Sequence, residues 1–146
     1  MDSIWQQMCE AAGLDPVARL AAREAVLADA AALECSLYRP DENDPDAEEE
    51  DLGEARVLLR GLFVPPADWS AQEVADFYDG EDPQQFFSAR IECEAAPGSA
   101  GFFMVEPGDY AAVTEDGLVV MYFVCDCHED DAGLHCILQR DEIELD

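Results

Sequence analysis

The sequence has no lysine, and its seven basic residues, all arginine, stand against 35 aspartates and glutamates. The formal net charge is -28 at pH 7, so most carboxylates find no basic partner and must face water. Direct binding to nucleic acid or to an anionic membrane is not expected, because both ligands need a basic patch. A strongly basic protein is the natural complement of such a surface.

Long apolar runs are also absent. No stretch approaches the roughly 20 residues that a membrane helix needs, and the first residues lack the basic and apolar regions of a signal peptide. Six cysteines without a secretory signal indicate reduced thiols rather than a disulfide framework. These observations predict a cytoplasmic protein, and its 146 residues fit one domain, residues 1–146.

Catalytic signatures are missing as well. The chain has no glycine-rich phosphate loop after a strand and no Gly-x-Ser-x-Gly motif. Cys127 and His128 are neighbours, so on a strand they point to opposite faces and cannot act as a nucleophile and its base. The acidic stretch at Asp41 fails as an EF-hand, because Asp41, Asn43 and Pro45 together do not give the ligand pattern and no glycine is sixth. The sequence predicts a protein that is not an enzyme and has no cofactor.

Helical signals fill the first half of the chain. Ser3 and Gln6 form one capping box, Ser70 and Glu73 form another, and Asp15 precedes a proline at a helix start. Apolar residues then recur at the helical period. The predicted helices cover approximately residues 3–12, 16–38, 45–62 and 71–80.

Strand signals begin near Gln84. Leu118 to Val124 is an apolar run that suits a central strand covered on both faces, and residues 134–140 return beside it after a polar turn. The other predicted strands are residues 86–94, 101–105 and 110–113. A helical part of about residues 3–80 before a sheet of about residues 84–143 predicts the α+β class. We expect N-terminal helices packed on an antiparallel β-sheet of about four strands.

One cluster could hold a metal ion. On a hairpin, Cys125 and Cys127 share a face, and a turn that sets Cys127 opposite His135 brings three ligands together, with Cys93 as a fourth. The spacing matches no standard zinc template. The alternatives are that Cys125 is a core residue and the others decorate the end of the hairpin, or that the cluster holds a reactive thiol or a disulfide.

Carboxylates are densest in two blocks, which we predict to contact a partner. On a helix, carboxylates three or four residues apart lie about 5–6 Å from one another, a spacing of the same order as that of nucleic-acid phosphates. An acidic face can therefore act as a decoy for a protein that grips nucleic acid. The predicted contact residues are Asp44, Asp46, Glu48, Glu49, Glu50, Asp51 and Glu54 in the first block, and Asp76, Asp79, Glu81 and Asp82 in the second.

The leading interpretation is a non-enzymatic inhibitor that blocks the nucleic-acid-binding surface of a basic protein complex. In size, charge and lack of catalytic motifs the chain resembles the nucleic-acid mimics of phages and mobile elements, the anti-CRISPR and anti-restriction proteins. The alternatives are an immunity protein or acidic chaperone for one cognate toxin or effector, and a metal-binding or thiol protein that uses the Cys125–Cys136 cluster. A merely soluble acidic surface or adaptation to high salt would also explain the charge.

Overall fold

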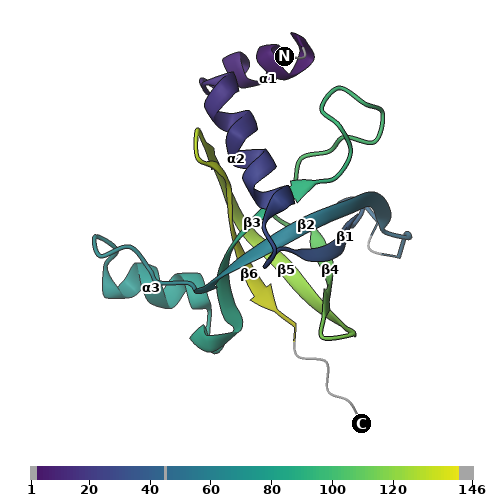
Figure 1. Cartoon of the computed structure of the whole chain (residues 1–146). Coiled ribbons are helices and arrows are strands. Elements are labelled where there is room, and N and C mark those ends of the chain that lie inside the picture. Colours follow the sequence, from purple (N-terminus) through teal and green to yellow (C-terminus); the bar gives the residue numbers. More distant parts are fainter. Residues whose placement is uncertain (1–2, 45, 142–146) are drawn as a thin grey trace.

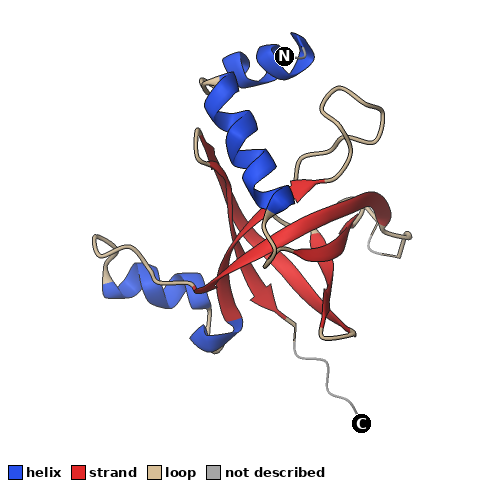
Figure 2. Cartoon of the chain, viewed as in Figure 1, coloured by secondary structure: helices blue, strands red, loops and turns tan. Residues whose placement is uncertain are grey.

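The chain forms a closed barrel of six antiparallel strands with three α-helices outside it, as the computed structural model shows for residues 3–44 and 46–141 (Figures 1 and 2). The strands follow one another around the barrel in the order β1-β2-β3-β6-β5-β4, and β4 pairs with β1 to close it. In chain order the elements are α1 (Ser3–Ala11), α2 (Pro16–Ala28), β1 (Leu33–Arg39), β2 (Glu50–Leu62), α3 (Ala71–Tyr78), the 3₁₀ helix η1 (Pro83–Gln85), β3 (Phe86–Cys93), β4 (Tyr110–Glu115), β5 (Leu118–Asp130) and β6 (Gly133–Arg140).

The predicted open sheet of about four strands is wrong, because two segments predicted as helix are strands. The first is β1, which was expected to continue the helix from residue 16 to residue 38. Asp29 ends α2 with an extended backbone, and its carboxylate accepts a hydrogen bond from Ala31 N at 2.8 Å. Beyond this stop, Cys35 and Leu37 are buried whereas Glu34 is exposed, which is the alternation of a strand.

The second is β2, where the sequence predicted a helix over residues 45–62. Gly53 and Gly61 have φ angles of 122° and 103°, which a helix excludes. Gly61 lies where the register with β3 shifts, so the long strand can bend around the barrel there. Pro45, the predicted helix start, lies outside the described residues. The helical part is therefore smaller than the predicted residues 3–80, and β1 and β2 belong to the barrel instead.

The second half of the chain agrees better with prediction. The hairpin of β5 and β6 is confirmed, as is the strand predicted at residues 86–94. Two details are wrong: residues 101–105 form no strand, and β5 is not covered on both faces. Tyr122 and Val124 are buried, whereas Phe123 between them is only partly buried, because one face of a barrel strand looks outward. Leu118 and Val119, at the start of β5, are 68% and 59% exposed.

Alternate residues of all six strands fill the barrel. Leu37, Val57, Val113, Val124 and Leu138 are each 0% exposed, and they belong to one continuous apolar cluster. No helix among residues 3–44 and 46–141 has the length and apolar character that a membrane crossing requires.

α3 lies on an arm that projects from one side of the barrel, between β2 and β3 (Figure 1). The capping box predicted for it is confirmed, since Ser70 Oγ accepts from Glu73 N at 3.1 Å. None of its residues is fully buried. Aromatic rings hold the arm instead: Phe77 contacts the rings of Phe63, Trp69 and Phe86 at centroid distances of 5.1, 5.6 and 5.5 Å.

Because the Phe77 ring makes most of the aromatic contacts between the α3 arm and its surroundings, Phe77→Ala is expected to detach the arm while the barrel stays folded. The local loss should be about 2–3 kcal/mol, less than the about 3–5 kcal/mol of a fully buried phenylalanine. Amide hydrogen exchange should speed up across α3 and remain slow in β5 and β6. Phe123→Ala is the control, since Phe123 packs on Tyr110 at 5.3 Å on the barrel itself. Uniformly faster exchange in the Phe77 variant would contradict this role.

Candidate functional site

The first predicted acidic block lies on the connection between β1 and β2 and on the start of β2. We call residues 41–54 the acidic segment. Its predicted contact carboxylates are all exposed, and none forms an ion pair within the described part of the chain. The contact residues in question are Asp44, Asp46, Glu48, Glu49, Glu50, Asp51 and Glu54. They are therefore available to a basic partner.

Part of the acidic segment surrounds a notch of about 340 Å³. Arg39 is one of its lining residues, and its guanidinium forms two hydrogen bonds to the buried Asp109, at 2.9 and 3.0 Å. This contact raises the pKa of Arg39, and the nearby charges of Glu106 and Glu50 contribute to the rise. Asp41, Glu48 and Glu50 line the notch and form no ion pair within the described part of the chain. A notch of this kind suits the arginine or lysine side chain of another protein.

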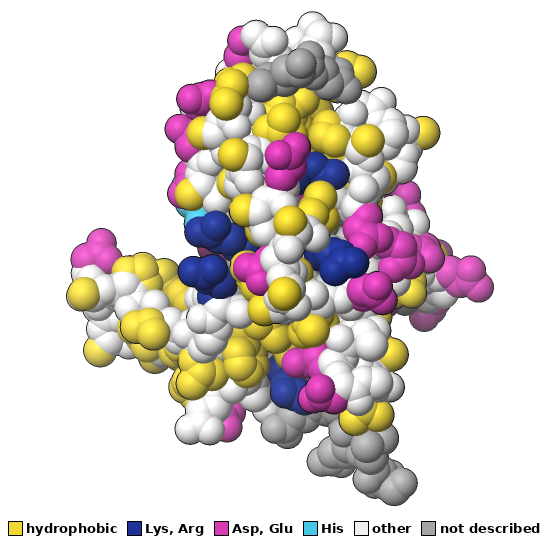
Figure 3. Space-filling view, viewed as in Figure 1, with side chains coloured by type: hydrophobic (Ala, Val, Ile, Leu, Met, Phe, Trp, Pro, Cys, Tyr) yellow, Lys and Arg dark blue, Asp and Glu magenta, His cyan; other side chains and the backbone are white. Residues whose placement is uncertain are grey.

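The second predicted block lies on the α3 arm. Asp76, Asp79, Glu81 and Asp82 are all exposed and unpaired among the described residues, yet they lie on the opposite side of the barrel from the acidic segment (Figure 1). In the view of Figure 3, acidic side chains gather where β2 begins, whereas the side that carries α3 is largely apolar. The structure does not bring the two blocks onto one face.

The local geometry of the acidic segment also differs from prediction. The expected helical spacing of its carboxylates is wrong, because the segment is a loop that runs into a strand. Only Glu50, Asp51 and Glu54 lie in the strand, where alternate side chains are about 6–7 Å apart, still of the order of phosphates that advance about 3.4 Å per nucleotide along the axis. The chain turns before it, since Ala47 N donates to the Asp44 carbonyl oxygen at 3.1 Å. A spacing like that of a nucleic-acid backbone is therefore present at the start of β2 alone.

The cysteine and histidine cluster has a different register from the predicted one. Asp130 pairs with Gly133, which leaves a two-residue turn and places Cys127 opposite Cys136 and His128 opposite His135. The predicted pairing of Cys127 with His135 is therefore wrong by one residue. Because neighbours alternate between faces, the two thiols turn toward the core and the two imidazoles turn outward.

The alternation of side chains between the two faces of β5 is also interrupted, at a position before Cys127. The register jumps between Val124 and Asp126, so Cys125 is the extra residue of a β-bulge. Val124 and Cys127, three positions apart, both contact the core. The regular alternation that was predicted to set Cys125 and Cys127 on one face does not hold across this bulge. Cys125 is half-buried, not a fully buried core residue.

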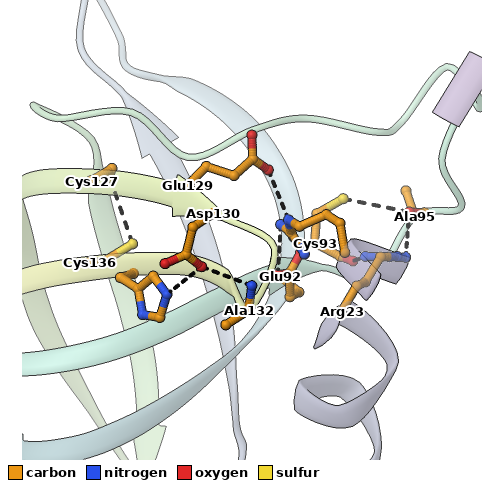
Figure 4. A network of polar contacts seen from close by, with 11 residues as sticks. Arg23, Glu92, Cys93, Ala95, Cys127, Glu129, Asp130, Ala132 and Cys136 are labelled. Carbon is orange, nitrogen blue, oxygen red and sulfur yellow. Dashed lines mark hydrogen bonds and ion pairs between the residues drawn. The ribbon is translucent and has the colours of Figure 1, made fainter. Parts of the chain in front are cut away.

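The thiols are poorly suited to a metal or to nucleophilic chemistry. Cys127 and Cys136 are free cysteines with sulfurs 3.7 Å apart (Figure 4). The hydrogen bond with Cys127, together with burial, raises the pKa of Cys136, and burial raises the pKa of Cys125 to about 11. Thiolates are the reactive form and the metal-binding form. Cys93 lies apart from the pair, and among the described residues no three side chains converge as metal ligands.

A buried charge cluster fixes α2 to the barrel, and the sequence did not predict it. Arg19 is 1% exposed and contacts Glu92 of β3 and Glu129 of β5, each at 2.9 Å. Arg23 donates to the carbonyl oxygens of Cys93 and Ala95 (Figure 4). The available signal was that these arginines lie four residues apart, on one face of a predicted helix. Arg19 and Arg23 are buried, so their charges do not offset the carboxylates on the surface.

Comparison with known proteins finds no family model, no curated protein and no solved structure that matches this chain.

Proposed function

We propose that this protein is a cytoplasmic, non-enzymatic inhibitor that covers the nucleic-acid-binding surface of a basic protein or complex. The acidic segment is the contact surface. One observation carries the proposal: its carboxylates are exposed and form no ion pair within the part of the chain that the structure describes, although the fold pairs acids with arginine elsewhere. Exposed charges of one sign repel one another and destabilise the folded chain, and a basic partner relieves this repulsion.

The notch at Arg39 supports the same function. Nucleic-acid-binding surfaces present arginine and lysine side chains, and these have the length and charge to enter a notch lined by Asp41, Glu48 and Glu50. Nε and Nη2 of Arg39 both donate to Asp109, so Arg39 can remain in place when a second cation approaches. The acidic segment thus offers exposed carboxylates along its length and, at the notch, a binding site for one basic side chain.

A tagged pull-down from nuclease-treated host lysate tests this function. The bound proteins would be washed at about 0.1 M and about 1 M salt, because the Debye length falls from about 10 to about 3 Å over this range. We expect a basic nucleic-acid-binding protein, released by high salt and displaced by added DNA or RNA. Retention of a single partner at high salt, with no displacement by nucleic acid, would contradict the proposal.

Retention of a single partner at high salt would favour an immunity protein or an acidic chaperone with one cognate partner. A specific observation supports this second candidate. Leu62 and Val64 are 51% and 78% exposed, and they flank Phe63, which anchors the α3 arm. The arm therefore combines exposed apolar and acidic side chains, the mixture that a salt-resistant interface uses.

A further inference from the structure

A groove of about 530 Å³ lies on the outer face of the barrel, beside the base of the α3 arm. Strand pairing places three basic side chains in a row across it, since Arg90 of β3 is opposite His135 of β6, and His135 is opposite His128 of β5. Their neighbours along the strands, among them Ala89 and Cys136, are buried, so the row faces outward. Arg60 of β2 also lines the groove.

The charge of this groove is opposite to that of the molecule. Arg60 and Arg90 form no ion pair within the described residues, unlike Arg19, Arg39 and Arg56. In Figure 3, basic side chains gather beside a histidine where the α3 side meets the barrel. In a chain with a net charge of -28 and seven arginines, two uncompensated guanidiniums at one groove form a local site for an anion.

The two histidines and the one acidic residue of the groove are held in place. His135 Nε2 lies 2.9 Å from Asp130 Oδ1, and the His128 and His135 rings are stacked with centroids 6.4 Å apart. Asp126 is the acidic residue that lines the groove, and its carboxylate accepts a hydrogen bond from Cys127 N at 2.9 Å. The two arginines therefore outnumber the one carboxylate that lines the groove, and Asp130, next to it, is engaged by His135.

The rest of the wall is apolar, with Phe63, Pro66 and Ile137 among its residues. The volume lies within the about 300–1,000 Å³ of small-molecule sites, which commonly combine apolar walls with a few polar groups. A ligand with many charges would be repelled by the acidic surface outside the groove. The site therefore suits a flat apolar body that carries a single negative charge.

We propose that this groove binds small aromatic monoanions, that is, ligands with a carboxylate or sulfonate on an aromatic ring system. Arg60 and Arg90 bind the anion, since a guanidinium presents paired donors to such groups. Phe63 and Ile137 contact the rings. This site is separate from the acidic segment and does not depend on the function proposed for it.

Two fluorescent probes that share a ring system test the assignment on the full chain: 8-anilino-1-naphthalenesulfonate, which is an anion, and N-phenyl-1-naphthylamine, which lacks the sulfonate. We expect one saturable site for each. Arg90→Gln and Arg60→Gln should each weaken the anion about 10-fold or more, the effect of losing a charge-assisted contact. Either variant should leave the neutral probe within about twofold, since the apolar wall is intact.

Arg140→Gln is the matched control, because Arg140 also forms no ion pair among residues 3–44 and 46–141 but does not line the groove, and it should change neither probe. Since Arg60 and Arg90 form no ion pair with any described residue, their variants should unfold at the wild-type temperature. Amide chemical shifts on adding the sulfonate should move at Ser88 and Ile137. An equal loss for both probes, unchanged anion binding in both variants, or shifts confined to another face would overturn the proposal.

Discussion

Replacement of Arg19 by methionine is expected to lower the free energy of unfolding by about 3–5 kcal/mol, the usual cost of leaving a buried charge without its partner. The side chain is 1% exposed and joins Glu92 and Glu129 of two different strands to α2. Methionine retains a long side chain beside the Trp5 ring, over which Arg19 lies at 5.6 Å, but it removes the charge. Urea unfolding followed by circular dichroism measures the loss.

The double variant Arg19→Met, Glu92→Leu is the matched test, because it removes both buried charges. It should recover most of the loss, since an apolar pair commonly replaces a buried ion pair without cost. Arg56→Met is the control, as Arg56 pairs with Glu94 at 3.1 Å where the two side chains are 32% and 41% exposed. Its expected loss is below about 1 kcal/mol. Equal losses for Arg19→Met and Arg56→Met would contradict a buried, tightly coupled cluster.

The loss in free energy of unfolding that Arg19→Met causes should depend on pH. Burial raises the pKa of Glu92, and Arg19 opposes this rise. A carboxyl whose pKa is raised by folding stabilises the folded state below its unfolded pKa of about 4.3, and this contribution is lost as the pH rises through the folded-state pKa. Without Arg19 the pKa of Glu92 rises further. The deficit should therefore be smaller at about pH 5 than at about pH 8.

Neutralising the acidic segment should weaken partner binding about 100-fold to 1,000-fold. The variant carries four near-isosteric changes: Asp46→Asn, Glu48→Gln, Glu49→Gln and Glu50→Gln. At about 1 kcal/mol for each lost ionic contact, and with about 1.4 kcal/mol for each tenfold change in Kd, the loss is about 3–4 kcal/mol. Titration calorimetry with the captured partner measures it. The association rate should also fall, and with it the dependence of affinity on salt.

A control with the same net charge separates contact from general repulsion. It neutralises four exposed carboxylates elsewhere: Glu10→Gln, Glu24→Gln, Asp116→Asn and Asp141→Asn. Asparagine is tolerated at Asp116, whose φ angle is 51°. This control should bind within about threefold of the wild type. If both variants lost affinity equally, total charge rather than the acidic segment would carry the interaction.

The sequence predicted correctly those elements whose structure depends on residues close together in the chain, such as helix caps and a hairpin turn. The Ser70 capping box, the α1 helix and the β5–β6 hairpin were predicted because the relevant residues are near neighbours in sequence. β2 was missed because Leu52, Ala55 and Leu58 recur every three residues, as on a helix, although Ala55 and Val57 are both buried as alternate residues of a strand. Pairing with distant strands decided the structure of both β1 and β2. Gly53 and Gly61 were the overlooked signal, since glycine inside a helix costs about 1 kcal/mol.

The candidate surface could be predicted in part, because exposure of a carboxylate follows from charge alone. The relative placement of the two acidic blocks could not, because it depends on how the barrel closes. The hairpin register at His135 was missed by one residue, since the chain permitted a longer turn than the two residues that it uses. Arg90 gave no signal by itself, and only the register with β6 sets it beside His135.

Closure of the barrel also limits how this protein can recognise others. Each of the six strands has a neighbour on both sides, so the backbone groups between neighbours are taken up in the ladder. Along the stretches that pair on both sides, an incoming peptide finds no free edge to which it could add as a further strand. Recognition at these stretches must therefore depend on side chains. The same closure blocks the edge-to-edge stacking that leads to fibrils, and mutual repulsion between acidic copies acts in the same direction.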